Sequence, residues 1–126
     1  LANGRYDRVI QLVSRARELD PNINNASIGV VLATSQYMLG RYGEAQESAS
    51  YCVQRAPSST LCRENLVRAL GQAGKIAAAQ AEVAELLRRS PGYSISEFRR
   101  RATITYRSAE DIERMADGLR RAGLPE

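Results

Sequence analysis

The most reactive side chains in this sequence are two thiols, Cys52 and Cys62. A thiolate can ligate a metal ion, but a zinc site needs about four ligands, and the chain contains no histidine to complete one. The sequence therefore predicts no metal site and no cofactor. We expect both cysteines to be reduced, partly buried thiols of a cytoplasmic protein. The alternative is a disulfide, because Cys52 lies late in one predicted helix and Cys62 early in the next.

No other group of residues forms a recognisable catalytic pattern. The sequence contains neither a glycine-rich phosphate loop nor a nucleophile with a base at a known spacing. Asp7, Glu44, Glu47 and Asp111 lie near predicted helix starts or on predicted solvated faces, where a carboxylate needs no catalytic role. We therefore predict that this chain is not itself an enzyme.

The composition excludes further classes of function. The chain has 126 residues, about one domain's length, and no apolar run reaches the roughly 18 residues that span a bilayer. Its 18 basic and 14 acidic residues are spread along the sequence without a block of like charge. We therefore expect no direct contact with nucleic acid and no membrane association. No signal or transit segment is recognisable, so the predicted location is the cytoplasm.

Residues 1–93 contain an internal repeat. Each unit has a glycine before an amphipathic helical run and a proline after it. The glycines are Gly4, Gly40 and Gly74, and the prolines are Pro21, Pro57 and Pro91. In both sets the residue number rises by 36 and then by 34. A period of about 34 residues with two helices per unit is typical of the tetratricopeptide repeat.

Apolar residues at three- and four-residue spacing predict the helices. The expected ranges are 7–19, 26–39, 42–56, 60–73, 76–89 and 94–101, followed by a last helix between Ser108 and Gly123. Range 26–39 is apolar enough to lie between two neighbours. Gly4 is placed in a turn, so residues 1–3 are expected to end a helix whose beginning lies outside this sequence. The β-branched run at 103–106 is expected to end the sixth helix, and Ser108 with Asp111 is expected to form a capping box.

Residues 1–93 resemble the tetratricopeptide repeat family in further positions. An aromatic or apolar residue follows each glycine by two places, and a small residue follows it by five. These residues are Tyr6, Tyr42 and Ile76, then Val9, Ala45 and Ala79. The resemblance implies an all-α solenoid of antiparallel helix pairs. Range 1–23 would be the second half of a repeat, 24–59 and 60–93 whole repeats, and 94–126 a helical cap at the carboxyl-terminal end.

The resemblance also implies a concave groove that receives a peptide or a partner helix, because the first helix of each repeat lines such a groove in the family. The corresponding residues are Ser27, Val30, Thr34, Tyr37, Met38, Leu61, Glu64, Asn65, Arg68 and Gln72. Tyr37 and Met38 would be apolar anchors and Arg68 a polar one, unless Tyr37 and Met38 only fill the core. Asn65 and Arg68 also resemble part of the family's carboxylate clamp, but Val31 stands where its second asparagine is expected.

Ranges 96–101 and 111–126 resemble the carboxyl-terminal end of bacterial proteins that carry a class III adenylate or guanylate cyclase domain followed by such repeats. A similar ending follows winged-helix DNA-binding domains. The resemblance implies a non-catalytic interaction or regulatory module of a cyclase, or alternatively the arm of a transcriptional regulator. A third hypothesis is self-association. Its candidate surface is the amino-terminal helix face, which a preceding helix would otherwise cover.

Overall fold

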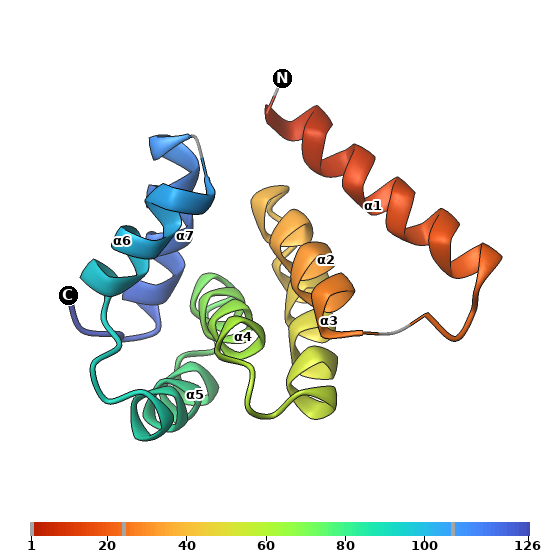
Figure 1. Cartoon of the computed structure of the whole chain (residues 1–126). Coiled ribbons are helices and arrows are strands. Elements are labelled where there is room, and N and C mark those ends of the chain that lie inside the picture. The colour runs from red at the N-terminus through yellow and green to blue at the C-terminus, as the bar shows by residue number, and fades with distance from the viewer. Residues whose placement is uncertain (1, 24, 107) are drawn as a thin grey trace. The chain divides into compact units, whose positions relative to one another are not determined.

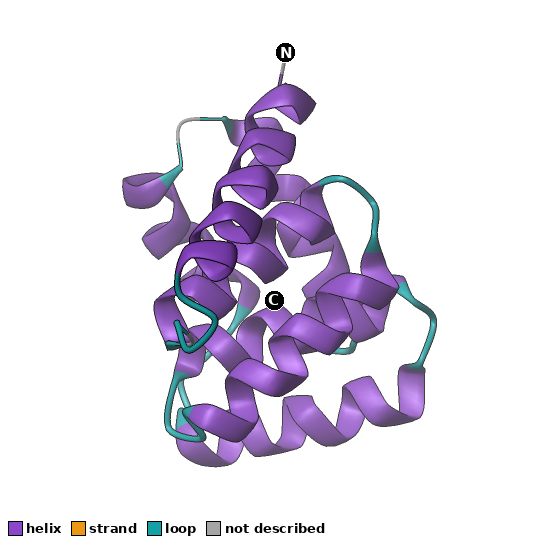
Figure 2. Cartoon of the chain, turned by 90° about the vertical axis from the view of Figure 1, so that its right-hand side faces the viewer, coloured by secondary structure: helices purple, strands orange, loops and turns teal. Residues whose placement is uncertain are grey.

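The computed structural model describes residues 2–23, 25–106 and 108–126, and over these ranges it is helical with no strand (Figures 1 and 2). The prediction of an all-α fold is confirmed. The described helices are α1 (Ala2–Leu19), α2 (Ala26–Met38), α3 (Tyr42–Arg55), α4 (Thr60–Gln72), α5 (Ile76–Arg89), α6 (Ile95–Thr105) and α7 (Ala109–Arg121). None of these helices combines the length and apolarity that crossing a bilayer requires.

The chain divides into two compact units, Leu1–Asn65 and Leu66–Glu126, with α4 beginning in the first and ending in the second. In the first unit, α2 packs against both α1 and α3. This confirms that the most apolar predicted helix lies between two neighbours. In the second unit, α6 packs against α7.

Two turns, one predicted period apart, have the same backbone geometry. Gly40 and Gly74 have φ values of 78° and 75°, a region that glycine enters without steric cost. The next residues, Arg41 and Lys75, have φ and ψ of −89° and 67°, and −85° and 67°. Their amides donate to the carbonyl oxygens of residues 36 and 70 at 2.9 and 3.1 Å. The predicted period is therefore present in the backbone of these two turns.

The ends of the helices that follow these turns repeat as well. Ala56 and Ser90, the C-caps of α3 and α5, have φ and ψ of −135° and 73°, and −136° and 80°. The amide three residues later donates to each cap carbonyl, from Ser59 to Ala56 and from Tyr93 to Ser90, both at 2.9 Å. The backbone geometry of α3 therefore matches that of α5 both before and after the helix.

The first predicted turn is wrong, because Gly4 lies inside α1. Glycine costs a helix only about 1 kcal/mol relative to alanine, so the helical run around Tyr6 can extend through it. Residues 2 and 3 begin α1 instead of ending a separate helix, and residue 1 lies outside the described residues.

The predicted end of α6 is also wrong, because the helix continues from residue 101 to Thr105. The β-branched residues do not break it. The Thr103 hydroxyl donates to the Arg99 carbonyl at 2.7 Å, a bond that a helical threonine makes one turn back. The backbone becomes extended only at Tyr106. The predicted bounds of the second to fifth helices differ from the structure by at most one residue.

Helix caps and the last residues of the chain organise the end of the second unit. The Ser108 hydroxyl accepts from the Asp111 amide at 3.2 Å, which confirms one half of the predicted capping box. Ser94 caps α6 in the same way, through the Glu97 amide. Two other amides at the start of α6 donate to late carbonyls of the chain, from Ile95 to Pro125 and from residue 96 to residue 126, at 2.9 and 3.0 Å. The first amides of a helix have no acceptor within the helix itself. In α6 they bond to Ser94, which precedes the helix, and to residues 125 and 126, which come after it.

Each unit has a core of buried apolar residues. In the first unit, Tyr37, Ala45 and Ala49 are buried, and the rings of Tyr37 and Tyr42 meet with their centroids 5.3 Å apart. In the second, the stripe that helical spacing predicts on α7 is buried, namely Ile112, Met115, Ala116, Leu119 and Ala122. The described part of the chain thus has one helical core in each unit.

Candidate binding site

The residues of the predicted groove lie on α2 and α4, but most of them are buried. Ser27 and Leu61 are exposed, and Val30 and Gln72 are half-buried. The buried ones are Thr34, Tyr37, Met38, Glu64, Asn65 and Arg68. Tyr37 and Met38 are only 2% and 1% exposed, which supports the alternative that they fill the core. The partner-binding role of the groove residues stays a prediction.

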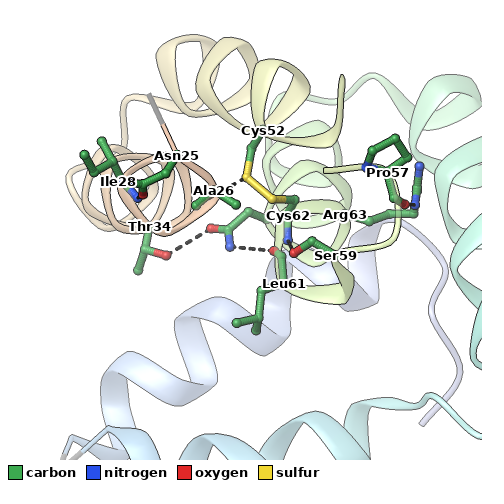
Figure 3. The surroundings of a disulfide bond; sticks show 11 residues. Asn25, Ala26, Ile28, Thr34, Cys52, Pro57, Ser59, Leu61, Cys62 and Arg63 are labelled. Atoms are coloured by element: carbon green, nitrogen blue, oxygen red, sulfur yellow. Dashed lines mark hydrogen bonds between the residues drawn. A yellow bond between two sulfur atoms is a disulfide. The ribbon is translucent and has the colours of Figure 1, made fainter. Parts of the chain in front are cut away.

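Asn65 links two helices within the first unit. Its side-chain oxygen accepts from the Thr34 hydroxyl at 3.0 Å, and its amide nitrogen donates to the Leu61 carbonyl at 2.9 Å (Figure 3). A carboxylate clamp would need this amide to face a ligand. Both of its ends bond instead to the protein, so the geometry favours a structural role for Asn65.

Cys52 and Cys62 form a disulfide that joins α3 to α4 (Figure 3). Their Cα atoms lie 5.5 Å apart, in the usual range for a bridge. The expectation of two reduced thiols is therefore wrong, and the alternative is correct. The connection between α3 and α4 covers only residues 56–59, so the end of one helix and the start of the next lie side by side. The order of the helices predicts that these two residues are neighbours but does not determine the distance between them.

Gly29 permits the close packing of α2 on the disulfide. A Cβ atom at Gly29 would lie 3.1 Å from both the Cβ and the Sγ of Cys52. The same Sγ lies 3.6 Å from the Ala26 carbonyl oxygen. The backbone of α2 therefore rests directly against this end of the bridge.

A pocket of about 430 Å³ lies in the first unit, beside this contact. The end of α1, the loop after it, α2 and α3 contribute its walls. Its lining residues are Arg17, Pro21, Ile23, Asn25, Ala26, Gly29, Leu32, Glu47, Ser48, Tyr51, Cys52 and Arg55. This pocket was not predicted from the sequence, because its residues come from three helices and a loop whose packing a helical pattern does not determine. The one available signal is an arginine in the last turn of both α1 and α3.

Exposed ion pairs shift the pKa values of two carboxyl groups. Hydrogen bonds from Arg88 and Arg89 lower the pKa of Glu85 to about 2. Arg99 donates to both carboxylate oxygens of Glu113 at 2.7 Å, across the α6–α7 pair, and lowers the pKa of that carboxyl. Among the described residues, no group of three or more His, Cys, Asp or Glu side chains is arranged to hold a metal ion.

Comparison with known proteins does not assign the chain to a family. No protein-family model matches it, and a search of the curated proteins finds no match.

Proposed function

We propose that this chain is a non-catalytic protein-interaction module built of tetratricopeptide-like helix pairs. The observation that carries the proposal is the repeat in the backbone, with Gly40 and Gly74 in equivalent turns one period apart. The small residues five places later, Ala45 and Ala79, are 1% and 0% exposed, as close helix packing at equivalent places requires. Repeated helix pairs serve widely as surfaces for peptides and partner helices.

The proposed partner is a protein or a peptide that reaches the accessible part of the predicted groove. Ser27 and Leu61 are its exposed members. Val31, the neighbouring position where the family's clamp has an asparagine, is 45% exposed. Two of these three exposed side chains are aliphatic and the third is uncharged, which favours an apolar partner segment with few charges.

Site-specific photocrosslinking tests this proposal. A benzophenone amino acid replaces Leu61, and the matched control carries it at Ile104, which is exposed on α6 of the other unit. After irradiation in the source cells, we expect a defined crosslinked protein from position 61 and none from position 104. Equal crosslinking from both positions would contradict a specific interaction surface.

Self-association is a second candidate, favoured by two leucines on α1. Leu12 and Leu19 are 61% and 80% exposed, and a partner helix would remove both from water. Sedimentation equilibrium separates the two candidates, since a monomer at every concentration would exclude the dimer. The Leu12→Ser variant should shift the equilibrium toward monomer if this face associates.

The parent protein that we propose is a bacterial adenylate or guanylate cyclase, with the arm of a winged-helix regulator as the alternative. The resemblance of ranges 96–101 and 111–126 supports both parents. An immunoblot of the native product tests them, because a species much heavier than 13.9 kDa would carry a fused domain that can be assayed for cyclic nucleotide synthesis. A cytoplasmic location belongs to this proposal, but the disulfide weighs against it, since cytoplasmic reductants keep most thiols reduced.

A further inference from the structure

The pocket of the first unit contains two arginines from different helices. Arg17 lies in the last turn of α1, and Arg55 is the last residue of α3. The Arg55 guanidinium donates to the Tyr51 hydroxyl at 2.6 Å and lies over the Tyr51 ring, 5.0 Å from its centroid. These contacts hold one face of the guanidinium, and its remaining N–H groups can bond to a ligand.

Acidic side chains do not neutralise these arginines. Glu47 is the acidic residue that lines the pocket, and within the described chain it forms no ion pair with Arg17 or Arg55. Arg17 is half-buried and has no ion-pair partner among the described residues. The pocket therefore has one surplus positive charge. Arg17 is the partly desolvated arginine of the pair, since Arg55 is exposed, and it gains most from an anion that it can bond in a bidentate way.

The rest of the wall suits an apolar group. Pro21, Ile23, Ala26 and Leu32 line the pocket beside the charged residues. Its volume of about 430 Å³ is within the range of small-ligand sites, about 300–1,000 Å³. A ligand that fills this space must combine an anionic end with a compact apolar body.

We propose that this pocket binds a carboxylate attached to a compact apolar or aromatic group, with Arg17 and Arg55 bonding to the carboxylate. Free carboxylic acids and the carboxyl-terminal residue of a peptide share this chemistry. The site lies wholly within the first unit and is independent of the repeat assignment. If no carboxylate binds there, the proposed interaction function is unaffected.

Three probes distinguish the sources of the carboxylate. The uniformly ¹⁵N-labelled chain is titrated with 3-phenylpropanoate, with the peptide acetyl-glycyl-phenylalanine, and with the carboxyl-terminal amide of that peptide. We expect saturable shifts in the amide signals of pocket residues with one or both acids. Tighter binding of the peptide acid identifies a peptide terminus as the ligand, and tighter binding of phenylpropanoate identifies a free acid. Absence of binding by both acids, or equal binding of the peptide amide, would overturn the proposal.

Charge-neutral variants test the assigned residues. We expect Arg17→Gln and Arg55→Gln to weaken acid binding by about tenfold or more, because each removes a charge-assisted contact. Arg15→Gln is the matched control, since Arg15 is exposed on the same helix outside the pocket. Glu47→Gln should tighten binding by removing the one negative charge. Unchanged affinity in both pocket arginine variants would show that the acid binds elsewhere. Circular dichroism checks the fold of each variant. If one arginine variant unfolds, the Glu47→Gln variant still tests the proposal, because unchanged or weaker acid binding by that variant would contradict it.

Discussion

Replacing Gly71 by alanine should destabilise the second unit although it improves the helix. Gly71 lies in the last turns of α4, where a Cβ atom would sit 2.3 Å from the Gly118 carbonyl oxygen of α7 and 3.0 Å from the Ala122 nitrogen. Ordinary van der Waals contact begins near 3.4 Å, so the two backbones must separate by about 1 Å, the difference between 3.4 and 2.3 Å. Neither obstructing atom belongs to a flexible side chain that could move aside.

The magnitude follows from two opposing terms. Alanine gains about 1 kcal/mol in helix propensity over glycine. Overpacking a close contact costs about 1–3 kcal/mol, and a backbone clash belongs at the upper end of that range. The Gln72 amide also donates to Asp117 at 3.2 Å, and this bond would lengthen as the helices part. The difference between the two terms predicts a net loss of about 1–2 kcal/mol in the free energy of unfolding.

Urea unfolding followed by circular dichroism measures this loss. The matched control is Gly43→Ala in α3, where an added Cβ meets nothing within 4 Å. The control should keep most of the propensity gain and become more stable by up to about 1 kcal/mol. A Gly71→Ala variant as stable as the unaltered chain would refute the close approach of α4 and α7.

Three further predictions concern the bridge, the caps and the surface charges. Replacing both cysteines by alanine should lower the free energy of unfolding by about 3 kcal/mol, the chain-entropy estimate for a separation of 10 residues, and should make the urea midpoint insensitive to reductant. Ser94→Ala should cost about 1 kcal/mol in the same assay by removing the N-cap of α6, whereas Ser58→Ala, which replaces an exposed loop serine, should cost little. The Glu85 carboxyl should titrate near pH 2, as measured by ¹³C NMR, because Arg88 and Arg89 lower its pKa from 4.5; its contribution to stability is present above the unfolded pKa and is lost as the pH falls toward 2. High salt should return its midpoint toward 4.5.

The helices could be predicted from the sequence because their signals are local. Apolar spacing, the turn glycines and the capping serines act within a few residues, and most predicted bounds agree with the structure to one residue. Gly4 shows the limit of such signals. Glycine permits both a turn and a helix, and the residues around Gly4 decide between them.

The candidate site could not be predicted in the same way. The disulfide depends on the distance between two neighbouring helices, and Cys52 and Cys62 carry no local sign of it. The pocket depends on how α1 and the loop after it lie against α2. It also depends on the close approach of α2 to Cys52 of α3, which the absence of a side chain at Gly29 allows. The burial of Tyr37 and Met38 likewise arises from packing, since a groove-lining helix and a core helix can share one apolar pattern.

The bonds from α6 to residues 125 and 126 bear on the order in which the chain can fold. The α2–α3 pair is joined by the short turn at Gly40, so it can close as soon as one continuous stretch of the chain is available. The start of α6 acquires two of its amide bonds only after residues 125 and 126 have been synthesised. Until then, the Ser94 hydroxyl is the local cap for that helix. During synthesis on the ribosome, we therefore expect α2 and α3 to become protected from hydrogen exchange before the start of α6, because contacts between distant residues must first overcome the entropy of loop closure.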